Sequence, residues 1–479
     1  MKKLWFILLL SSLLSAKSIE PTSIDQDIIS HTFNEEFDQA KQLCREQINL
    51  NPGSPKYYYY IINVKILEYY KRMSELNPDN RDEGRKALNK EIIDYCENVI
   101  DKFDESKMNT ESKFYFGSIY GYLARIYGID GSWWSAFKSG KKAKSLMNDV
   151  LKADPNFYDA YLALGMIEYY ADRLSGVTSF VAGILGLSGN RDTGLYYLKL
   201  AYEKGTLTFG QSALTLIEVY ASLEGNDYAA LPYFESFVKR FPKNKRTLNA
   251  YCNTLINIWD LKKTADIIKN DKLNLVDDYV KTRFYDAIGN SRLTIQYGEK
   301  ALSDDKKLWH GATNNIRYII AYNSWLLGDN TKANKYETLL DERGKKDFAQ
   351  EKNHEKESKW LHDLSVKVAS GVTENDMEYF IKSKPSFNST KDFDEQFNAL
   401  LGIFYFKNSL YDKASLSFNS LISSADQRNK YIAMKYLIDI YMKQNTDKAK
   451  VKDLLSAIDD NDNARMKYRA KDLEKKYNL

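Results

Sequence analysis

The 479-residue sequence contains few of the residue patterns that build enzyme centres. It has four histidines, and none of them belongs to a His-Glu-x-x-His or comparable metal-binding spacing. A Gly-x-Ser-x-Gly elbow is absent, and no glycine-rich loop ends in Gly-Lys-Ser/Thr after a strand. We therefore expect no catalytic residues, no metal site and no cofactor, and we expect that the protein is not an enzyme.

Cysteine and proline are also scarce. Cys44, Cys96 and Cys252 are an odd number at wide spacing, which indicates neither a disulfide framework nor a zinc site. Cys44 and Cys252 lie among apolar helix positions and are expected to be small core residues. The chain has only eight prolines, which leaves room for long uninterrupted helices.

The sequence has no strong excess of one charge. Its 69 Lys and Arg residues and 65 Asp and Glu residues give a net charge of +4, with both signs interspersed. Nucleic-acid binding depends on concentrated positive charge, so we expect no nucleic-acid partner. A composition of 43% hydrophobic and 28% charged residues is typical of a folded protein with a mixed-charge surface.

The N-terminus has the features of a secretory leader. Lys2 and Lys3 precede an apolar stretch, residues 4–14, which is followed by small residues up to Ala16. A stretch of this length is too short for a hydrocarbon core that needs ~20 residues. We expect a signal peptide at residues 1–18 and export to the periplasm or cell envelope of a bacterium, with the extracellular medium as the alternative.

What the sequence does contain is a set of helical repeats. In the clearest unit, seven residues follow the spacing of a tetratricopeptide repeat: Leu401, Gly402, Tyr405, Tyr411, Ala414, Phe418 and Leu421. Small side chains at Gly402 and Ala414 let two antiparallel helices approach closely, and larger residues fill the space and contact the next hairpin. The pattern predicts an all-α fold, a right-handed α-solenoid of antiparallel helical hairpins.

Other units follow the pattern less completely. Three of them end near Asn51-Pro52, Asp154-Pro155 and Pro242, where proline closes the second helix. The charged run at residues 342–359 is the best candidate for a boundary. We predict an N-terminal solenoid at residues 19–341, a charged linker or long helix at 342–372, and C-terminal helical repeats at 373–479.

One hairpin contains an insertion. Residues 154–165 have the pattern of one repeat's end and the next repeat's first helix, but the second helix resumes only at Gly194. The insertion, residues 175–190, is largely apolar. Residues 186–195, with Trp133, Trp134 and residues 139–143, resemble bacterial exported tetratricopeptide proteins and, more distantly, the eukaryotic tetratricopeptide family of inclusion-body clearance proteins. The resemblance covers about residues 115–245 and implies a binding or scaffold role without catalytic residues.

Two interpretations of the insertion remain open. It is either a short helix that covers its own hairpin, burying Phe180, Ile184 and Leu187 for about 1.5–3 kcal/mol each, or an exposed apolar loop. In the second case it would contact a membrane or an apolar partner. The absence of Lys and Arg from residues 175–190 weighs against anionic lipid.

Several residues are candidates for contact with a partner. Trp133 and Trp134 follow a break between helices, and the concave face of a helical array would carry residues of its first helices. The further candidates are Tyr161, Glu168, Tyr169, Arg191 and Tyr405. For Glu168 the alternatives are a structural ion pair with Arg125, Lys138 or Arg191, and a contact with a ligand.

The predicted function is that of an exported scaffold or adaptor in the cell envelope. It would bind a protein or peptide partner through its concave helical surface. The alternative is a lipid- or membrane-associated carrier that uses the apolar insertion at residues 175–190.

Overall fold

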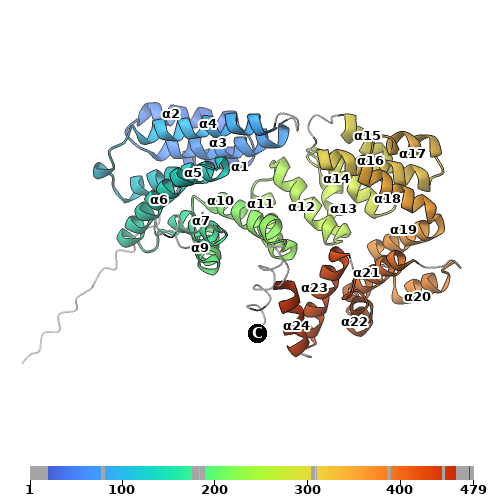
Figure 1. Ribbon diagram of the computed structural model, residues 1–479. Helices are drawn as coiled ribbons and strands as arrows, with labels where there is room; N and C mark the ends of the chain where they lie inside the picture. The colour runs from blue at the N-terminus through green and yellow to red at the C-terminus, as the bar shows by residue number, and fades with distance from the viewer. Residues whose placement is uncertain are drawn as a thin grey trace, which may run out of the picture. The chain divides into compact units, whose positions relative to one another are not determined.

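The computed structural model describes residues 20–76, 81–174, 183, 189–303, 308, 310–385, 390–424, 426–444, 448–459 and 474. Throughout these residues every regular element is a helix (Figure 1), which confirms the all-α prediction. The predicted signal peptide, residues 1–18, lies outside the described residues, which begin at residue 20. None of the described helices combines the length and apolar character that a membrane span requires.

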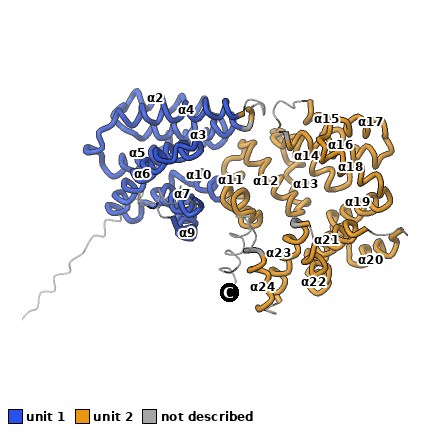
Figure 2. Tube along the Cα trace, in the orientation of Figure 1, with its two compact units in different colours: residues 1–73, 82–216 blue, residues 74–81, 217–479 orange. Residues whose placement is uncertain are grey.

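The chain forms two compact units (Figure 2). Unit 1 contains residues 1–73 and 82–216, and unit 2 contains residues 74–81 and 217–479. The predicted charged segment, residues 342–372, therefore lies within unit 2. It forms two helices, α18 (Glu342–Asn353) and α19 (Glu355–Ser370), each of which buries an apolar side chain, Phe348 in one and Leu364 in the other.

Unit 1 is built from successive helices. They are α1 (Ser23–Phe33), α2 (Phe37–Leu50), α3 (Lys56–Glu75), α4 (Arg81–Ile100), α5 (Thr110–Asp130), α6 (Trp133–Ala153), α7 (Ala160–Asp172), α9 (Arg191–Lys204) and α10 (Phe209–Ile217). Polar side chains fix several starts: Thr22 forms a capping box with Asp25, and Asn109 and Asn190 cap α5 and α9.

Neighbouring helices of unit 1 pair as antiparallel hairpins. Lys113, near the start of α5, pairs with Asp149, near the end of α6, at 3.4 Å. In the next hairpin, a Cβ added to Gly165 of α7 would lie 2.8 Å from the backbone nitrogen of Leu198 in α9. The small residues that the repeat pattern requires thus let α7 and α9 meet. Most of the insertion between them, residues 175–182 and 184–188, lies outside the described residues.

Unit 2 continues the chain with further helices. A π-helical turn at Glu218–Leu223 is followed by α11 (Asp227–Arg240), α12 (Lys245–Asn257), α13 (Leu261–Asn270), α14 (Asp278–Ala287), α15 (Ser291–Ser303), α16 (His310–Leu326) and α17 (Asn330–Glu337). After α18 and α19 come α20 (Glu374–Lys382), α21 (Lys391–Lys407), α22 (Tyr411–Asn419), α23 (Gln427–Lys443) and α24 (Lys448–Asp459).

The clearest predicted repeat is the hairpin of α21 and α22. A Cβ added to Gly402 would lie 2.6 Å from the ring of Phe418, so only glycine fits at this point. Ala414, Phe418 and Leu421 are fully buried in the same core. The close helix approach predicted from the spacing is confirmed here.

Candidate functional site

The tryptophan pair begins α6 and keeps accessible surface. Trp133 and Trp134 are 41% and 54% exposed. The ring of Trp133 packs near Phe137, with centroids 6.2 Å apart, and the ammonium of Lys138 lies 5.4 Å from the Trp134 ring. Both indoles therefore contact their own helix and still present surface to solvent.

Glu168 is held by a cation that sequence reasoning did not name. Its carboxylate accepts a hydrogen bond from Lys144 of α6 at 2.8 Å, so the three proposed partners are corrected to Lys144. Arg125 instead donates from Nε to the hydroxyl of Tyr70 at 2.6 Å. Arg191 is buried and lies 3.2 Å from Asp192. Glu168 is thus part of an ion pair that ties α6 to α7.

The predicted tyrosines differ in burial and belong to different units. Tyr161 is half-buried and packs on Tyr197, with ring centroids 5.0 Å apart. Tyr169 is fully buried, so it belongs to the core and offers no surface to a partner. Tyr405 is half-buried in unit 2 beneath the ammonium of Lys413. The predicted apolar contact residues Phe180, Ile184 and Leu187 lie outside the described residues.

A cavity of about 470 Å³ opens in unit 1 between α2 and α4, and we call it the α2–α4 groove. Its lining residues come from three helices: Lys41, Arg45, Ile48 and Asn49 from α2; Tyr58, Ile61, Lys65, Glu68 and Arg72 from α3; and Glu91, Tyr95 and Lys102, which lie on α4 and just after it. The second helices of two successive hairpins thus form its walls, and α3 forms its floor.

The helical period brings these residues to one surface. The five lining residues of α3 follow spacings of three and four, which places them on one stripe of the helix. Those of α2 follow the same rule from Lys41 to Ile48. Sequence reasoning missed this site, although the stripe on α3 was readable in the sequence.

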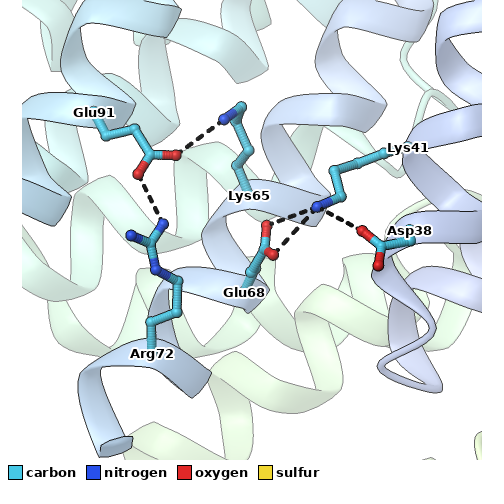
Figure 3. Close-up of polar contacts among 6 residues, drawn as sticks. All are labelled: Asp38, Lys41, Lys65, Glu68, Arg72 and Glu91. Carbon is cyan, nitrogen blue, oxygen red and sulfur yellow. Dashed lines mark hydrogen bonds and ion pairs between the residues drawn. The ribbon is translucent and has the colours of Figure 1, made fainter. Parts of the chain in front are cut away.

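Ion pairs occupy one end of the groove (Figure 3). The ammonium of Lys41 lies between Asp38 and Glu68, at 3.1 and 3.2 Å. Glu91 likewise receives hydrogen bonds from Lys65 at 3.2 Å and Arg72 at 2.7 Å. These bonds connect α2 to α3 and α3 to α4, so they hold the groove walls to its floor.

Hydrogen bonds favour the charged forms of Glu91 and Lys41. Burial acts to raise the pKa of Glu91, but hydrogen bonds from Arg72 and Lys65 outweigh it and leave that pKa below its usual value of 4.5. Burial acts to lower the pKa of Lys41, but hydrogen bonds to Asp38 and Glu68 leave that pKa above 10.5. The carboxylate and the ammonium are therefore both ionised at neutral pH.

The other end of the groove is open. Arg45 and Lys102 are exposed, and neither has a carboxylate within 4.0 Å among the residues that the structure describes. The ammonium of Lys102 lies 5.2 Å from the Tyr58 ring, and that of Lys65 lies 4.9 Å from the Tyr95 ring. Burial raises the pKa of Tyr95 to about 12, and its hydroxyl is a hydrogen-bond donor. This end combines two available cations with aromatic and aliphatic surface.

Comparison with known proteins gives little beyond this geometry. No protein-family model matches the sequence, and no curated protein matches it. Among solved structures, the chain is similar to one from the crystal structure of the APC/C hetero-tetramer Cut9–Hcn1, with 14% identity over 95% of each chain and a TM-score of 0.22. Two chains with so low a score do not superpose as wholes, so the functional assignment has to come from the helical hairpins and the groove themselves.

Proposed function

We propose that this protein is a non-enzymatic scaffold that holds a segment of a partner protein in the α2–α4 groove. The observation that carries the proposal is a cavity of about 470 Å³ lined by charged groups together with the half-buried Ile48 and Tyr95 and the buried Tyr58 and Ile61. Tyrosine and arginine are, with tryptophan, the residues enriched at the energetic centres of protein interfaces.

The dimensions of the groove suit a peptide segment. Its stripe on α3 runs from Tyr58 to Arg72, which at about 1.5 Å per residue is roughly 21 Å. About six residues of extended chain cover that distance, or about four turns of helix. Hairpin arrays commonly bind such segments because stacked helices form long, continuous surfaces.

The groove is a different surface from the one that the repeat pattern suggested. Sequence reasoning favoured the concave face formed by first helices, whereas the groove has the second helices α2 and α4 as walls. Both surfaces remain part of the proposal, with the groove as the primary site. The proposal also places the protein in the bacterial cell envelope, on the strength of the leader-like residues 1–18. N-terminal sequencing of protein purified from the periplasmic fraction tests that placement.

Site-specific photo-crosslinking in the native host tests the interaction. A photoreactive residue at Asn49 would lie in the groove, whereas one at Gln42 would lie on an exposed part of the same helix outside it. We expect a discrete adduct from position 49 and none from position 42. The variant Asn49→Trp should fill the groove and block binding, while Gln42→Trp should not.

The outcomes separate clearly. Crosslinks to the same partner from both positions, or a partner that still binds Asn49→Trp with unchanged affinity, would show that the groove is not the binding site. Circular dichroism of both tryptophan variants controls for folding, since both positions are exposed on α2.

A second function, that of a lipid- or membrane-associated carrier, is favoured by one sequence feature. Residues 175–190 carry Phe180, Ile184 and Leu187 with no Lys or Arg. In this alternative the insertion docks on a bilayer. Liposome flotation tests it: flotation of the full chain that disappears when residues 176–187 are deleted supports the carrier, and no flotation of the full chain rejects it.

A further inference from the structure

The α2–α4 groove concentrates positive charge in a chain that is nearly balanced overall. Its lining contains five cations, Lys41, Arg45, Lys65, Arg72 and Lys102, and two carboxylates, Glu68 and Glu91, so the lining has a formal charge of +3, which Asp38 beside Lys41 lowers to +2. The whole chain of 479 residues carries only +4. Three of the cations bond to the two carboxylates, which leaves Arg45 and Lys102 available for a ligand.

We infer that the segment held in the groove is acidic and carries an apolar side chain next to its carboxylates. This inference rests on the proposed function and names the chemistry of the partner. Arg45 projects from α2, and Lys102 lies just beyond the end of α4, so the two cations belong to opposite walls. A carboxylate of the segment bonds to them, and Arg45 supplies the paired donors that suit carboxylate geometry.

The apolar side chain of the segment would contact Ile48 and Tyr95. Ile48 and Tyr95 line the groove at its open end and are only half-buried, so both retain surface that an aliphatic or aromatic side chain covers. The Tyr95 hydroxyl adds a hydrogen-bond donor beside that surface. Recognition therefore requires negative charge and apolar bulk in the same short segment.

The walls disfavour other anionic ligands. A bilayer surface is broad, whereas this cavity is bounded on two sides by helices. A continuous polyphosphate, such as a nucleic-acid backbone, would pass Glu68 and Glu91 as well as the cations, and like charges in contact repel. A peptide avoids this repulsion because it spaces its acidic side chains.

Fluorescence anisotropy with defined peptides tests the inference on the full chain. The probe is a labelled peptide of about ten residues that alternates Glu with Leu, and matched peptides carry Gln or Lys in place of Glu. We expect the Glu–Leu peptide to bind at least tenfold more tightly than the Gln–Leu peptide, with affinity falling as salt increases. The double variant Arg45→Gln, Lys102→Gln should weaken binding of the Glu–Leu peptide about tenfold or more.

A matched control separates the groove from general charge. The double variant Lys300→Gln, Lys332→Gln removes the same charge from a cavity of unit 2 and should leave the affinity unchanged. The reversal Arg45→Glu, Lys102→Glu should abolish binding of the Glu–Leu peptide and create binding of the Lys–Leu peptide. Because Arg45 and Lys102 are exposed, these variants should keep the circular-dichroism spectrum of the parent chain.

Three results would overturn the inference: no binding of the Glu–Leu peptide, equal binding of the Glu–Leu and Gln–Leu peptides, or an equal loss in the unit 2 control. The variant Asn49→Trp distinguishes failure of the acidic preference from failure of the proposed function. If Asn49→Trp blocks the Gln–Leu peptide as well, the groove is still a segment-binding site and only its acidic preference is wrong. If Asn49→Trp leaves the binding of every peptide unchanged, the groove itself is not the site.

Discussion

Two cavities of similar size, one in each unit, differ in how they are built. The α2–α4 groove has about 470 Å³ and lining residues from three helices of unit 1. The cavity of unit 2 has about 510 Å³, but α15 supplies every lining residue except Lys332 of α17. Volume alone would rank them as equals. Because three helices line the α2–α4 groove, it can enclose a ligand. The unit 2 cavity, by contrast, lies mostly along one face of α15.

The chemistry of the lining residues also makes the α2–α4 groove the better binding site of the two cavities. Both have excess positive charge, since the unit 2 cavity has Arg292, Lys300 and Lys332 against Glu299. Only the groove adds aromatic rings, Tyr58 and Tyr95, to its charges. Because charge gives selectivity and desolvated aromatic surface gives most binding energy, the groove has both requirements for specific recognition.

The largest expected effect comes from Asp25→Ala, which should damage unit 1 and spare unit 2. The fully buried carboxylate of Asp25 pairs with Lys56 of α3 at 2.7 Å and completes the capping box of Thr22. Its removal leaves an unpaired, largely buried ammonium, so we expect a loss of about 3–5 kcal/mol in the free energy of unfolding of unit 1. Asp25→Asn should cost less because it keeps part of the hydrogen bonding.

Cysteine labelling followed by mass spectrometry measures this effect in each unit separately. Burial raises the pKa of all three thiols, Cys44 and Cys96 of unit 1 and Cys252 of unit 2, to about 12, so native thiols react slowly. In Asp25→Ala, Cys44 and Cys96 should be labelled much faster while Cys252 keeps its rate. Equal acceleration of Cys252 would contradict separate stability of the two units.

The converse variant is Gly298→Val in α15, the helix that lines the unit 2 cavity. A Cβ at this position would lie 2.8 Å from Cγ1 of the fully buried Ile320 in α16. Overpacking of this kind costs about 1–3 kcal/mol. Amide hydrogen exchange should therefore increase in α15 and α16 and stay unchanged in α2–α4. Gly53→Val is the control, because no atom lies within 4 Å of a Cβ added there.

The repeat pattern predicted the helix pairs well because it is a local property of the chain. Glycine opposite a large residue of the second helix means close approach, as Gly402 shows with Phe418, and Gly165 shows it with Leu198 across the insertion. The buried state of Cys44 and Cys252 followed from the same periodicity. These inferences need only the order of residues along one hairpin.

The site was harder to predict because it depends on register between helices. Several cations were possible partners of Glu168, and only the packing of α6 on α7 brings Lys144 to it. Periodicity likewise does not separate the buried Tyr169 from the half-buried Tyr161. The stripe on α3 was visible, but mixed aromatic and charged residues at helical spacing also occur on any half-exposed helix. The walls from α2 and α4 make that stripe a groove.

A smaller effect on peptide affinity should distinguish Glu91 of the groove from Glu299 of the unit 2 cavity. Glu91→Gln frees Lys65 and Arg72 and raises the formal charge of the groove lining to +4. Because Glu91 is 45% exposed, the free energy of unfolding should change by less than about 1 kcal/mol. Affinity for the Glu–Leu peptide should rise several-fold in anisotropy measurements. Glu299→Gln makes the same charge change in unit 2 and should leave the affinity unaltered; a rise in both variants would indicate general attraction only.

The smallest effect is the pH dependence of the ion pairs in the groove. Because the folded pKa of Glu91 lies below 4.5, its stabilising contribution is complete above that value and is lost as pH falls through the lowered pKa. The folded pKa of Lys41 lies above 10.5, so its contribution is complete below 10.5 and is lost as pH rises through the raised pKa. The difference in melting temperature between the parent chain and Glu91→Gln should stay constant between these limits and shrink on acidification, while that for Lys41→Gln should shrink only in strong base. A change in either difference near neutral pH would mean that groups other than Glu91 and Lys41 control the stability of the groove.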